Sequence, residues 1–599
     1  MKKFFNPNAL SVPANCCKVY RMLAKTVLPV LFALLTALFS SVASAQDQQE
    51  TQDPKIYYLK ADQGRSNHWD ESGFWYEANG SGTESVRPSE ITNSIFVVGN
   101  TFHLRTHRPN RDGNYDTTFG YYYAAGSHTN KLYIGYKVDL DAGTVDLNDY
   151  GEGVYGVLHL KTQARRPNEG NITVDDLYIG HGEIFQGETN STINLHGSLT
   201  IQGDARIRNV AEDKMAVEDR IFNIYSEIHG SGLLQFESEK THDNHTSEIY
   251  LMSSNNDFSG KVCVESGTHI HIDDPDEEHY YYDYQTHLYL VGENALCNAT
   301  HVLNEGFMYA NANQRFKNYD GDDSFGQFTG VGELIVNPGV NVELLYDNPE
   351  FGDEPIGLIT VKNENDNPGT LNFNVPEGMT KAITMSEDPA DYSKIAGQGI
   401  IEKTGDGALQ IIAAAEGLVG AESFVVSSGR LDMEGYFTGN LQVGEELPSG
   451  DYTIGTFSPG DVVSASINVL GDFDINENSI LVFEQDANGM EKLIATNVFI
   501  DSDSIIELIM GSERPGKEYS MIVQTSGDFT GDYASSDFWN SLLSDSSVEN
   551  WTVSVRGNTV YATIKGEPIP AVPEPSTWVL LILGVAELLY VRKCNNERR

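Results

Sequence analysis

Two short acidic runs are where this sequence gathers side chains that could hold a ligand. The first contains Asp273, Asp274 and Asp276 and leads into the aromatic segment 279–284, which reads His-Tyr-Tyr-Tyr-Asp-Tyr. Carboxylate oxygens are the ligands that Ca²⁺ prefers, and tyrosine rings combine a flat apolar body with a polar tip. Two interpretations follow: a sugar-binding aromatic platform beside a Ca²⁺ site, or a solvated loop inserted between two coils of the chain.

The second acidic run contains Asp320, Asp322 and Asp323 around one glycine. It lacks the ligand spacing and the terminal glutamate of an EF-hand, so the alternatives are a calcium loop and a polar turn. Clustered carboxylates repel one another at neutral pH, and a divalent cation would relieve that repulsion. Ca²⁺ is the one cofactor that the sequence suggests, and both runs are candidate sites for it.

Sequence motifs of common enzymes are absent. There is no His-Glu-x-x-His, Gly-x-Ser-x-Gly or Walker pattern among the 599 residues. Glycoside hydrolysis needs two carboxylates at a defined separation in space, and with 86 Asp and Glu residues no pair can be assigned by spacing along the chain. The sequence assigns no catalytic residue, and we expect a protein that is not an enzyme.

Charge and cysteine content narrow the class of protein further. The formal net charge is −47, and such a surface repels nucleic acid, so no nucleic-acid partner is expected. Of the five cysteines, only Cys263 and Cys297 lie outside the terminal segments. A disulfide between these two is allowed in an oxidising compartment.

The N-terminal segment has the features of a Sec signal peptide. Basic residues precede an apolar stretch, Val27–Phe39, and the small residues Ala43 and Ala45 form a cleavage site. Met22 would begin a more compact signal peptide than Met1. In either case we expect passage through the Sec translocon and a mature chain that begins near Gln46.

The C-terminal segment consists of three physically different zones. Pro573 and Pro575, with Glu574 between them, form a stiff extended peptide. An apolar run follows, Trp578–Val591, interrupted by Glu587, and as a helix its 14 residues would reach about 21 Å against a bilayer core of roughly 30 Å. Arg592, Lys593, Arg598 and Arg599 then form a basic stop that favours the cytoplasmic side.

This order of zones resembles the PEP-CTERM sorting signal of Gram-negative bacteria. The resemblance covers residues 572–599, and Pro573, Glu574 and Pro575 match the central triplet of that family. It implies that an exosortase-type membrane protease recognises and removes the tail after transient insertion in the inner membrane. The diluted basic cluster and Glu587 depart from the family pattern and bear on how efficiently the tail is processed. A plain C-terminal anchor is the alternative interpretation.

The body of the chain is dominated by short alternating strands broken by Gly and Asn, which predicts an all-β fold. Short helices are expected only around Asp388–Ile395 and Ser536–Leu543. An aromatic group, Trp69, Phe74, Trp75 and Tyr76, is a candidate cap. A Gly-x-Gly pattern recurs, and its three copies begin at Gly230, Gly330 and Gly397.

Two segments that follow the first and third of these copies, residues 256–262 and 399–411, resemble the autotransporter-associated β-strand repeat. That resemblance implies a right-handed parallel β-helix. Stacking would also solve the burial problem of strands too short to enclose a core alone. We therefore expect a right-handed parallel β-helix or solenoid with an N-terminal signal peptide and a single C-terminal hydrophobic helix.

The expected organisation follows the chain from one sorting signal to the other. Its parts are the signal peptide (1–45), an N-terminal cap and solenoid (46–226), a solenoid with autotransporter-like repeats (227–445), a C-terminal β segment (446–565), a Pro-rich linker with the Pro-Glu-Pro motif (566–575), and a transmembrane helix with a basic tail (576–599).

These features predict an exported protein of the cell surface or extracellular matrix with a structural or adhesive role, for which exopolysaccharide or other surface glycans are candidate partners. The rival interpretation is a polysaccharide-acting β-helix enzyme, a lyase or a glycoside hydrolase. Fold alone does not separate the two. A cleft lined by Asp or Glu with Lys or Arg would favour the enzyme.

Overall fold

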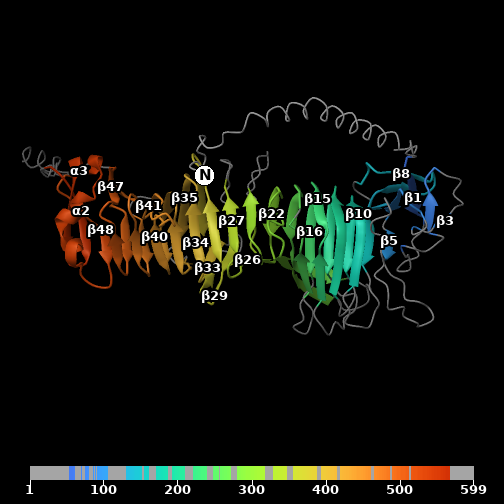
Figure 1. Cartoon of the computed structure of the whole chain (residues 1–599), viewed down its shortest axis with the longest axis horizontal. Helices are drawn as coiled ribbons and strands as arrows, with labels where there is room; N and C mark the ends of the chain where they lie inside the picture. The colour runs from blue at the N-terminus through green and yellow to red at the C-terminus, as the bar shows by residue number, and fades with distance from the viewer. Residues whose placement is uncertain are drawn as a thin grey trace, which may run out of the picture. The chain divides into compact units, whose positions relative to one another are not determined.

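A computed structural model gives the arrangement of most of the body (Figure 1). It divides into two compact units, residues 1–55 and 56–599, and the description below concerns the second unit, which includes all but three of the described residues. The structure describes residues 53–60, 69, 74–79, 85–86, 88, 91–100, 102–105, 130–150, 154–160, 170–186, 192–209, 220–238, 247–254, 256–271, 280–317, 328–346, 355–386, 393–413, 418–460, 465–485, 489–511 and 515–566.

Parallel strands stacked in register make up the body, which confirms the expectation of a mostly β fold consistent with a solenoid. The first sheet, which the chain revisits in almost every coil, contains β1 (Lys55–Leu59), β2 (Trp75–Glu77), β3 (Ser85–Val86), β4 (Ser94–Val98), β6 (Lys131–Ile134), β10 (Gly170–Ile179), β12 (Thr192–Ile201), β14 (Arg220–Ile224), β15 (Glu227–Gly230), β17 (Ser247–Leu251), β21 (His287–Leu290), β23 (Phe307–Ala310), β26 (Glu333–Val336), β28 (Gly357–Val361), β33 (Ser393–Gly397), β36 (Leu418–Val419), β39 (Gly435–Phe437), β42 (Ser466–Val469), β45 (Lys492–Ala495), β48 (Glu518–Gln524), β49 (Trp551–Arg556) and β50 (Thr559–Ile564).

A second sheet accompanies the first sheet in the N-terminal half of the solenoid. It contains β5 (Phe102–Arg105), β9 (Gly156–Leu160), β11 (Gly182–Gln186), β13 (Asp204–Asn209), β16 (Leu233–Ser238), β18 (Lys261–Val264), β22 (His301–Asn304) and β25 (Phe328–Thr329).

Two further sheets take over in the C-terminal half, so that each coil there has three strands. The third sheet contains β24 (Gln314–Lys317), β27 (Asn341–Leu345), β31 (Thr370–Asn374), β34 (Ile400–Thr404), β37 (Ser423–Val426), β40 (Asn440–Val443), β43 (Phe473–Ile475) and β46 (Val498–Ile500). The fourth contains β32 (Thr380–Met385), β35 (Ala408–Ala413), β38 (Gly429–Met433), β41 (Gly455–Ser458), β44 (Ile480–Gln485) and β47 (Ile505–Met510).

The core is a column of apolar side chains that continues from coil to coil. Alternate residues of each strand point inward, and the parallel register places each inward residue directly beside its counterpart in the next coil. One buried column of the first sheet consists of Phe222, Ile249, Leu288, Met308, Leu334, Ile359, Ile395, Val419, Phe437, Val469 and Ala495.

Glycine is required at the corners because successive coils approach closely there. A Cβ atom on Gly397 would lie 2.0 Å from the carbonyl oxygen of Val361 in the preceding coil, and the φ angle of Gly397 is +125°. Gly230 and Gly330 also have positive φ angles. The recurring Gly-x-Gly pattern therefore marks turns that bring one coil against the next.

Antiparallel strands pair with the parallel ladder at each of its two ends (Figure 1). At the N-terminal end β1 pairs with β2 in antiparallel register and also with β4, and Trp69 and Trp75 pack against Phe96 with ring centroids 5.0 Å away. At the C-terminal end the antiparallel strands β48, β50 and β49 adjoin the short helices α2 (Ser536–Ser541) and α3 (Asp545–Asn550), after a 3-10 turn, η2 (Gly531–Ala534).

Apart from the antiparallel strands at the two ends, the described residues form three hairpins: β7 (Lys137–Asp139) with β8 (Thr144–Asp146), β19 (Ser266–His271) with β20 (Tyr280–Gln285), and β29 (Asn363–Glu364) with β30 (Asn367–Pro368). In the last of these, Asn365 and Asp366 both have positive φ angles, as a tight two-residue hairpin turn requires.

The two helix expectations had different outcomes. The segment around Ser536–Leu543 contains α2, whose N-cap Ser535 accepts a hydrogen bond from the backbone N–H of Asp537. The other expectation was wrong where it can be compared, because residues 393–395 belong to β33 and Ile395 pairs with Ile359 and Val419. The pairing on both sides outweighs the weak local helix preference. Among the described residues no helix has the length and apolar character needed to cross a bilayer.

Candidate functional surfaces

Most of the residues singled out in the sequence lie outside the described part of the chain. These are Asp273, Asp274, Asp276, Asp320, Asp322, Asp323, the cleavage residues Ala43 and Ala45, the motif Pro573, Glu574 and Pro575, and the basic residues Arg592, Lys593, Arg598 and Arg599. Around the first acidic run the backbone forms the hairpin β19–β20, with His271 opposite Tyr280, between β18 and β21. Within the described ranges, no group of three His, Cys, Asp or Glu side chains is placed to hold a metal ion.

Cys263 and Cys297 are both free thiols, so the disulfide that the sequence allows is not formed in this structure. Cys263 lies on β18, where it pairs in register with Gln235 and Leu303 rather than facing Cys297. Burial raises the pKa of the Cys263 thiol to about 12, and the charges of Glu265 and Glu305 add to the shift. The Cys263 thiol therefore stays protonated at neutral pH.

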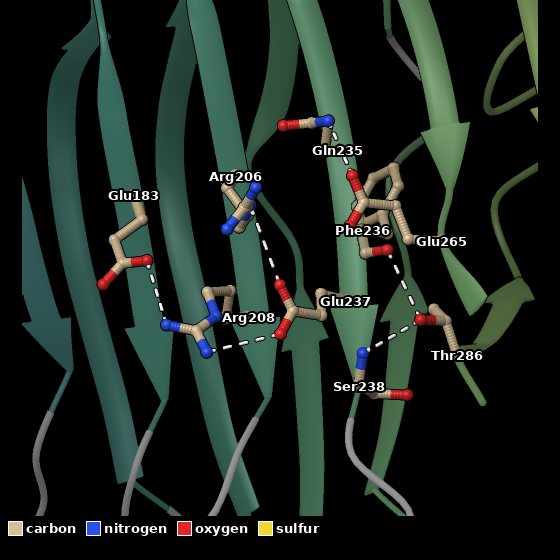
Figure 2. A network of polar contacts seen from close by, with 9 residues as sticks. All are labelled: Glu183, Arg206, Arg208, Gln235, Phe236, Glu237, Ser238, Glu265 and Thr286. Atoms are coloured by element: carbon tan, nitrogen blue, oxygen red, sulfur yellow. Dashed lines mark hydrogen bonds and ion pairs between the residues drawn. The ribbon is translucent and has the colours of Figure 1, made fainter. Parts of the chain in front are cut away.

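A cluster of opposite charges lies on the second sheet, and its centre is Arg208 (Figure 2). The Arg208 guanidinium reaches two coils at once: its Nη1 lies 3.2 Å from Glu183 Oε2 on β11, and its Nη2 lies 3.3 Å from Glu237 Oε1 on β16. The side chains of Arg208, Glu183 and Glu237 are 21%, 11% and 6% exposed. Arg206, two residues before Arg208 on β13, places its Nε 3.7 Å from Glu237 Oε2. We call Glu183, Arg206, Arg208, Glu237 and Glu265 the charged cluster.

Glu265 is the member of the charged cluster least balanced by a cation. Its Oε1 accepts a hydrogen bond of 2.6 Å from Gln235 Nε2. Burial raises the pKa of Glu265; the arginines Arg206 and Arg208 oppose the rise, and the carboxylates Glu237 and Glu305 add to it. Glu265 is thus held by an uncharged amide, whereas Arg208 is held by two carboxylates.

An aromatic stack lies on the outward side of the first sheet. Tyr250, Tyr289 and Tyr309 occupy equivalent register positions on β17, β21 and β23, with centroids 4.4 and 4.3 Å apart and planes within 10° of parallel. The sides of the three rings that face one another are covered, so those sides are not available to sugar rings. The Tyr250 and Tyr289 hydroxyls donate to the two oxygens of Glu248 at 2.7 and 2.9 Å. The stack therefore links three successive coils.

A polar groove of about 500 Å³ runs along the corner between the first and third sheets. Its lining residues come from successive corners: Asn363, Gly397, Gln398, Ala421, Glu422, Thr438, Gly439, Asn440 and Gly471. Asn363, on the hairpin β29–β30, donates from Nδ2 to Glu422 Oε2 at 2.7 Å. We call this feature the corner groove.

In comparisons with protein-family models, curated proteins and solved structures, no match to this chain was found.

Sequence reasoning missed the charged cluster and the corner groove. The charged cluster had one local signal, the alternation Asp-Ala-Arg-Ile-Arg-Asn over residues 204–209, which predicts that Arg206 and Arg208 share the outward face. Nothing local connects Arg208 with Glu183 or Glu237, because those partners are 25 and 29 residues away. Predicting the corner groove would have required knowing which residues of several coils lie side by side.

Proposed function

We propose that this chain is an exported β-solenoid with a structural or adhesive role at the cell surface or in the extracellular matrix. The observation that carries the proposal is that the outward ladders pair between coils: Arg208 joins Glu183 to Glu237, and Tyr289 stacks between Tyr250 and Tyr309. Such contacts stiffen a body and keep its reactive groups occupied. The net charge of −47 suits a solvated exported surface.

The coil is proposed to be right-handed. The support is general: a strand that returns to the same sheet as a parallel neighbour does so by a right-handed connection in nearly all known cases, and the first sheet is revisited in this way from β10 to β48. An experimental structure with a left-handed coil would contradict the proposal.

Delivery is proposed to use the two terminal segments. The Sec translocon would export the chain, the run Trp578–Val591 would enter the inner membrane transiently, and an exosortase-type protease would release the body near Pro573–Pro575. Glu587 disfavours permanent insertion, at a cost of up to roughly 3 kcal/mol near a bilayer centre.

Fractionation of cells that carry an epitope after Val591 tests delivery. We expect wild-type protein to lose the epitope in strains that have exosortase. The double substitution Pro573→Ala and Glu574→Ala should trap the full-length form in the inner membrane, and circular dichroism should show an unchanged body, because both residues follow β50. Retention of the epitope by the wild type would make the segment an ordinary anchor.

The adhesive role is tested by comparing cells that display the wild-type chain with cells that lack it. We expect faster attachment to surfaces coated with extracellular glycans, and loss of the difference when free glycan is added. Equal attachment of the two strains on every coating, with the protein detected outside, would remove the adhesive role and leave the structural one.

The charged cluster supports a second candidate, a polysaccharide-acting enzyme. Carboxyl and guanidinium groups are the residue types that lyases and hydrolases use, and in the charged cluster Arg206 and Arg208 act electrostatically on Glu265. Incubation of the exported protein with a panel of neutral and uronic-acid polysaccharides tests this, with Glu265→Gln as the comparison. Chain cleavage that Glu265→Gln abolishes would favour the enzyme; no cleavage of any substrate would favour the structural role.

A further inference from the structure

The corner groove crosses several coils instead of belonging to one. Asn363 follows β28, Gln398 follows β33, Glu422 follows β36, Thr438 follows β39, and Gly471 follows β42. Asn363 reaches along its hairpin to Glu422, so the length of the groove is set by the four corners from Gln398 to Gly471. Parallel strands lie about 4.8 Å apart, and three steps between these corners give roughly 14 Å. A groove of that length matches an extended chain molecule better than a single small ring.

Part of the corner groove is lined by backbone alone, for a structural reason. A Cβ atom on Gly397, Gly439 or Gly471 would lie 2.0, 2.2 or 2.4 Å from a carbonyl oxygen of the preceding coil. Stacking alone therefore explains why these residues are glycines. The consequence is that three of the nine lining residues contribute backbone alone, while Ala421 adds a methyl group.

The rim of the corner groove carries the recognition chemistry. Gln398, Glu422, Thr438 and Asn440 are exposed and come from three successive corners. Asn440 Oδ1 already accepts a hydrogen bond of 2.9 Å from the backbone N–H of Asp472, and Glu422 Oε2 accepts from Asn363. The rim therefore offers a sugar the Gln398 amide, the Thr438 hydroxyl, the Asn440 Nδ2 donor and the second Glu422 oxygen, which together include both donors and acceptors. Asn363, held to Glu422 by a hydrogen bond of 2.7 Å, extends this rim onto the hairpin β29–β30.

The negative charge of the protein limits which polymers the corner groove could bind. Glu422 is the charged residue of the described lining, and the whole chain carries −47. Polyanions, which include uronic-acid glycans, nucleic acids and acidic peptides, would therefore be repelled. The described lining also lacks aromatic side chains and a deep apolar pocket, which disfavours an apolar peptide.

We propose that the corner groove binds an uncharged glycan chain laid across successive coils, held by hydrogen bonds from Gln398, Glu422, Thr438 and Asn440. This inference rests on the adhesive role proposed above and gives that role a location. Each site is expected to be weak, because polar contacts in an open groove replace contacts with water at little net gain.

Binding of defined oligosaccharides to the full chain, purified in detergent, tests the proposal. The probes are uncharged linear hexasaccharides of glucose, mannose, galactose and N-acetylglucosamine, and a hexuronate of equal length. We expect calorimetry to detect at least one uncharged hexasaccharide, with the hexuronate at least tenfold weaker. No binding of any uncharged probe, or tighter binding of the hexuronate, would overturn the proposal.

Variants of the rim locate the site. The double substitution Gln398→Ala and Thr438→Ala should raise Kd at least tenfold, and Gln398→Trp should block the corner groove. Thr456→Ala, on β41 in the same coil as Thr438 but outside the groove, should leave Kd unchanged. An equal Kd for the wild type and both rim variants would contradict the proposal that the corner groove is the binding site.

Attachment of cells separates this proposal from the adhesive role. If cells carrying the rim variants still attach to glycan as the wild type does, the corner groove is not the binding site and the adhesive role stands. If no strain attaches, the adhesive role itself fails.

Discussion

The Nζ atom of Lys403 lies 2.7 Å from the carbonyl oxygen of Gly405, inside the solenoid rather than outside it. The carbonyls of Thr404 and Ser428 accept from the same nitrogen at 2.8 and 3.2 Å. On β34 Lys403 occupies an inward position, in register between Phe373 and Val426. A buried cation thus supplies hydrogens to three corner carbonyls.

Lys403 should make stability depend on pH in the alkaline range. Burial lowers the pKa of Lys403 from 10.5 to about 8. Between these values the unfolded chain binds a proton that the folded chain does not, so stability rises with pH by about 1.4 kcal/mol per unit from this group. The difference in unfolding free energy between the wild type and Lys403→Met should show this slope from pH 8 to 10. A difference in unfolding free energy that does not change between pH 8 and 10 would contradict the assignment.

Glu491 should act in the opposite sense at lower pH. Burial raises the pKa of Glu491 from 4.5 to about 7, against hydrogen bonds from Ser458 Oγ at 3.0 Å and from the backbone N–H of Glu484 at 2.8 Å. Here the folded state keeps a proton that the unfolded state releases, so this contribution to stability is lost as pH rises from 4.5 to 7. Denaturation of Glu491→Gln at pH 5 and pH 7 should show a smaller decrease than the wild type. An identical decrease in both proteins would refute the assignment.

Arg208 should be a strong determinant of stability. Arg208→Met leaves Glu183 and Glu237 facing each other across β13 without their shared cation, and breaking a buried ion pair in this way costs roughly 3–5 kcal/mol. Adding Glu183→Gln and Glu237→Gln to Arg208→Met should restore most of that stability, because the carboxylates are then uncharged. If thermal unfolding finds Arg208→Met as stable as the wild type, the cluster contributes nothing to the fold.

The corner glycines allow a matched pair of substitutions. Gly397→Ala places a methyl group 2.0 Å from the Val361 carbonyl, whereas a methyl group on Gly378, with φ +80°, would have no atom within 4 Å. Gly378→Ala measures backbone strain alone, about 1–2 kcal/mol. Gly397→Ala adds a collision with the preceding coil, and its cost should exceed about 4 kcal/mol, the range of severe disruptions. Equal losses in urea denaturation would mean that the coils can separate to admit the methyl group.

The stacking of the coils could be predicted from the sequence more readily than the pairing of side chains on the outer surface of the coils. The Gly-x-Gly pattern and the strand alternation predict the solenoid because close approach and burial act within a few residues. The helix expected around Asp388–Ile395 was wrong because Ile395 is fixed by partners in other coils. Pairing of Arg208 with Glu237, and of Asn363 with Glu422 across 59 residues, depends on how many residues each coil contains. Loop lengths between strands set that number, and no local pattern reveals it.

The in-register ladder also has a mechanical meaning. Hydrogen bonds between coils point along the direction of stacking, and the strands of each coil pair with those of adjacent coils. Tension between the two ends of the ladder acts on these interfaces in series, so the weakest interface opens first. The coil from Ile467 to its partner Leu493 spans 26 residues, and its release would lengthen the chain by up to roughly 85 Å at about 3.3 Å per residue. Under force such a body would unfold one coil at a time, and each step would lengthen the chain while the remaining coils stay folded.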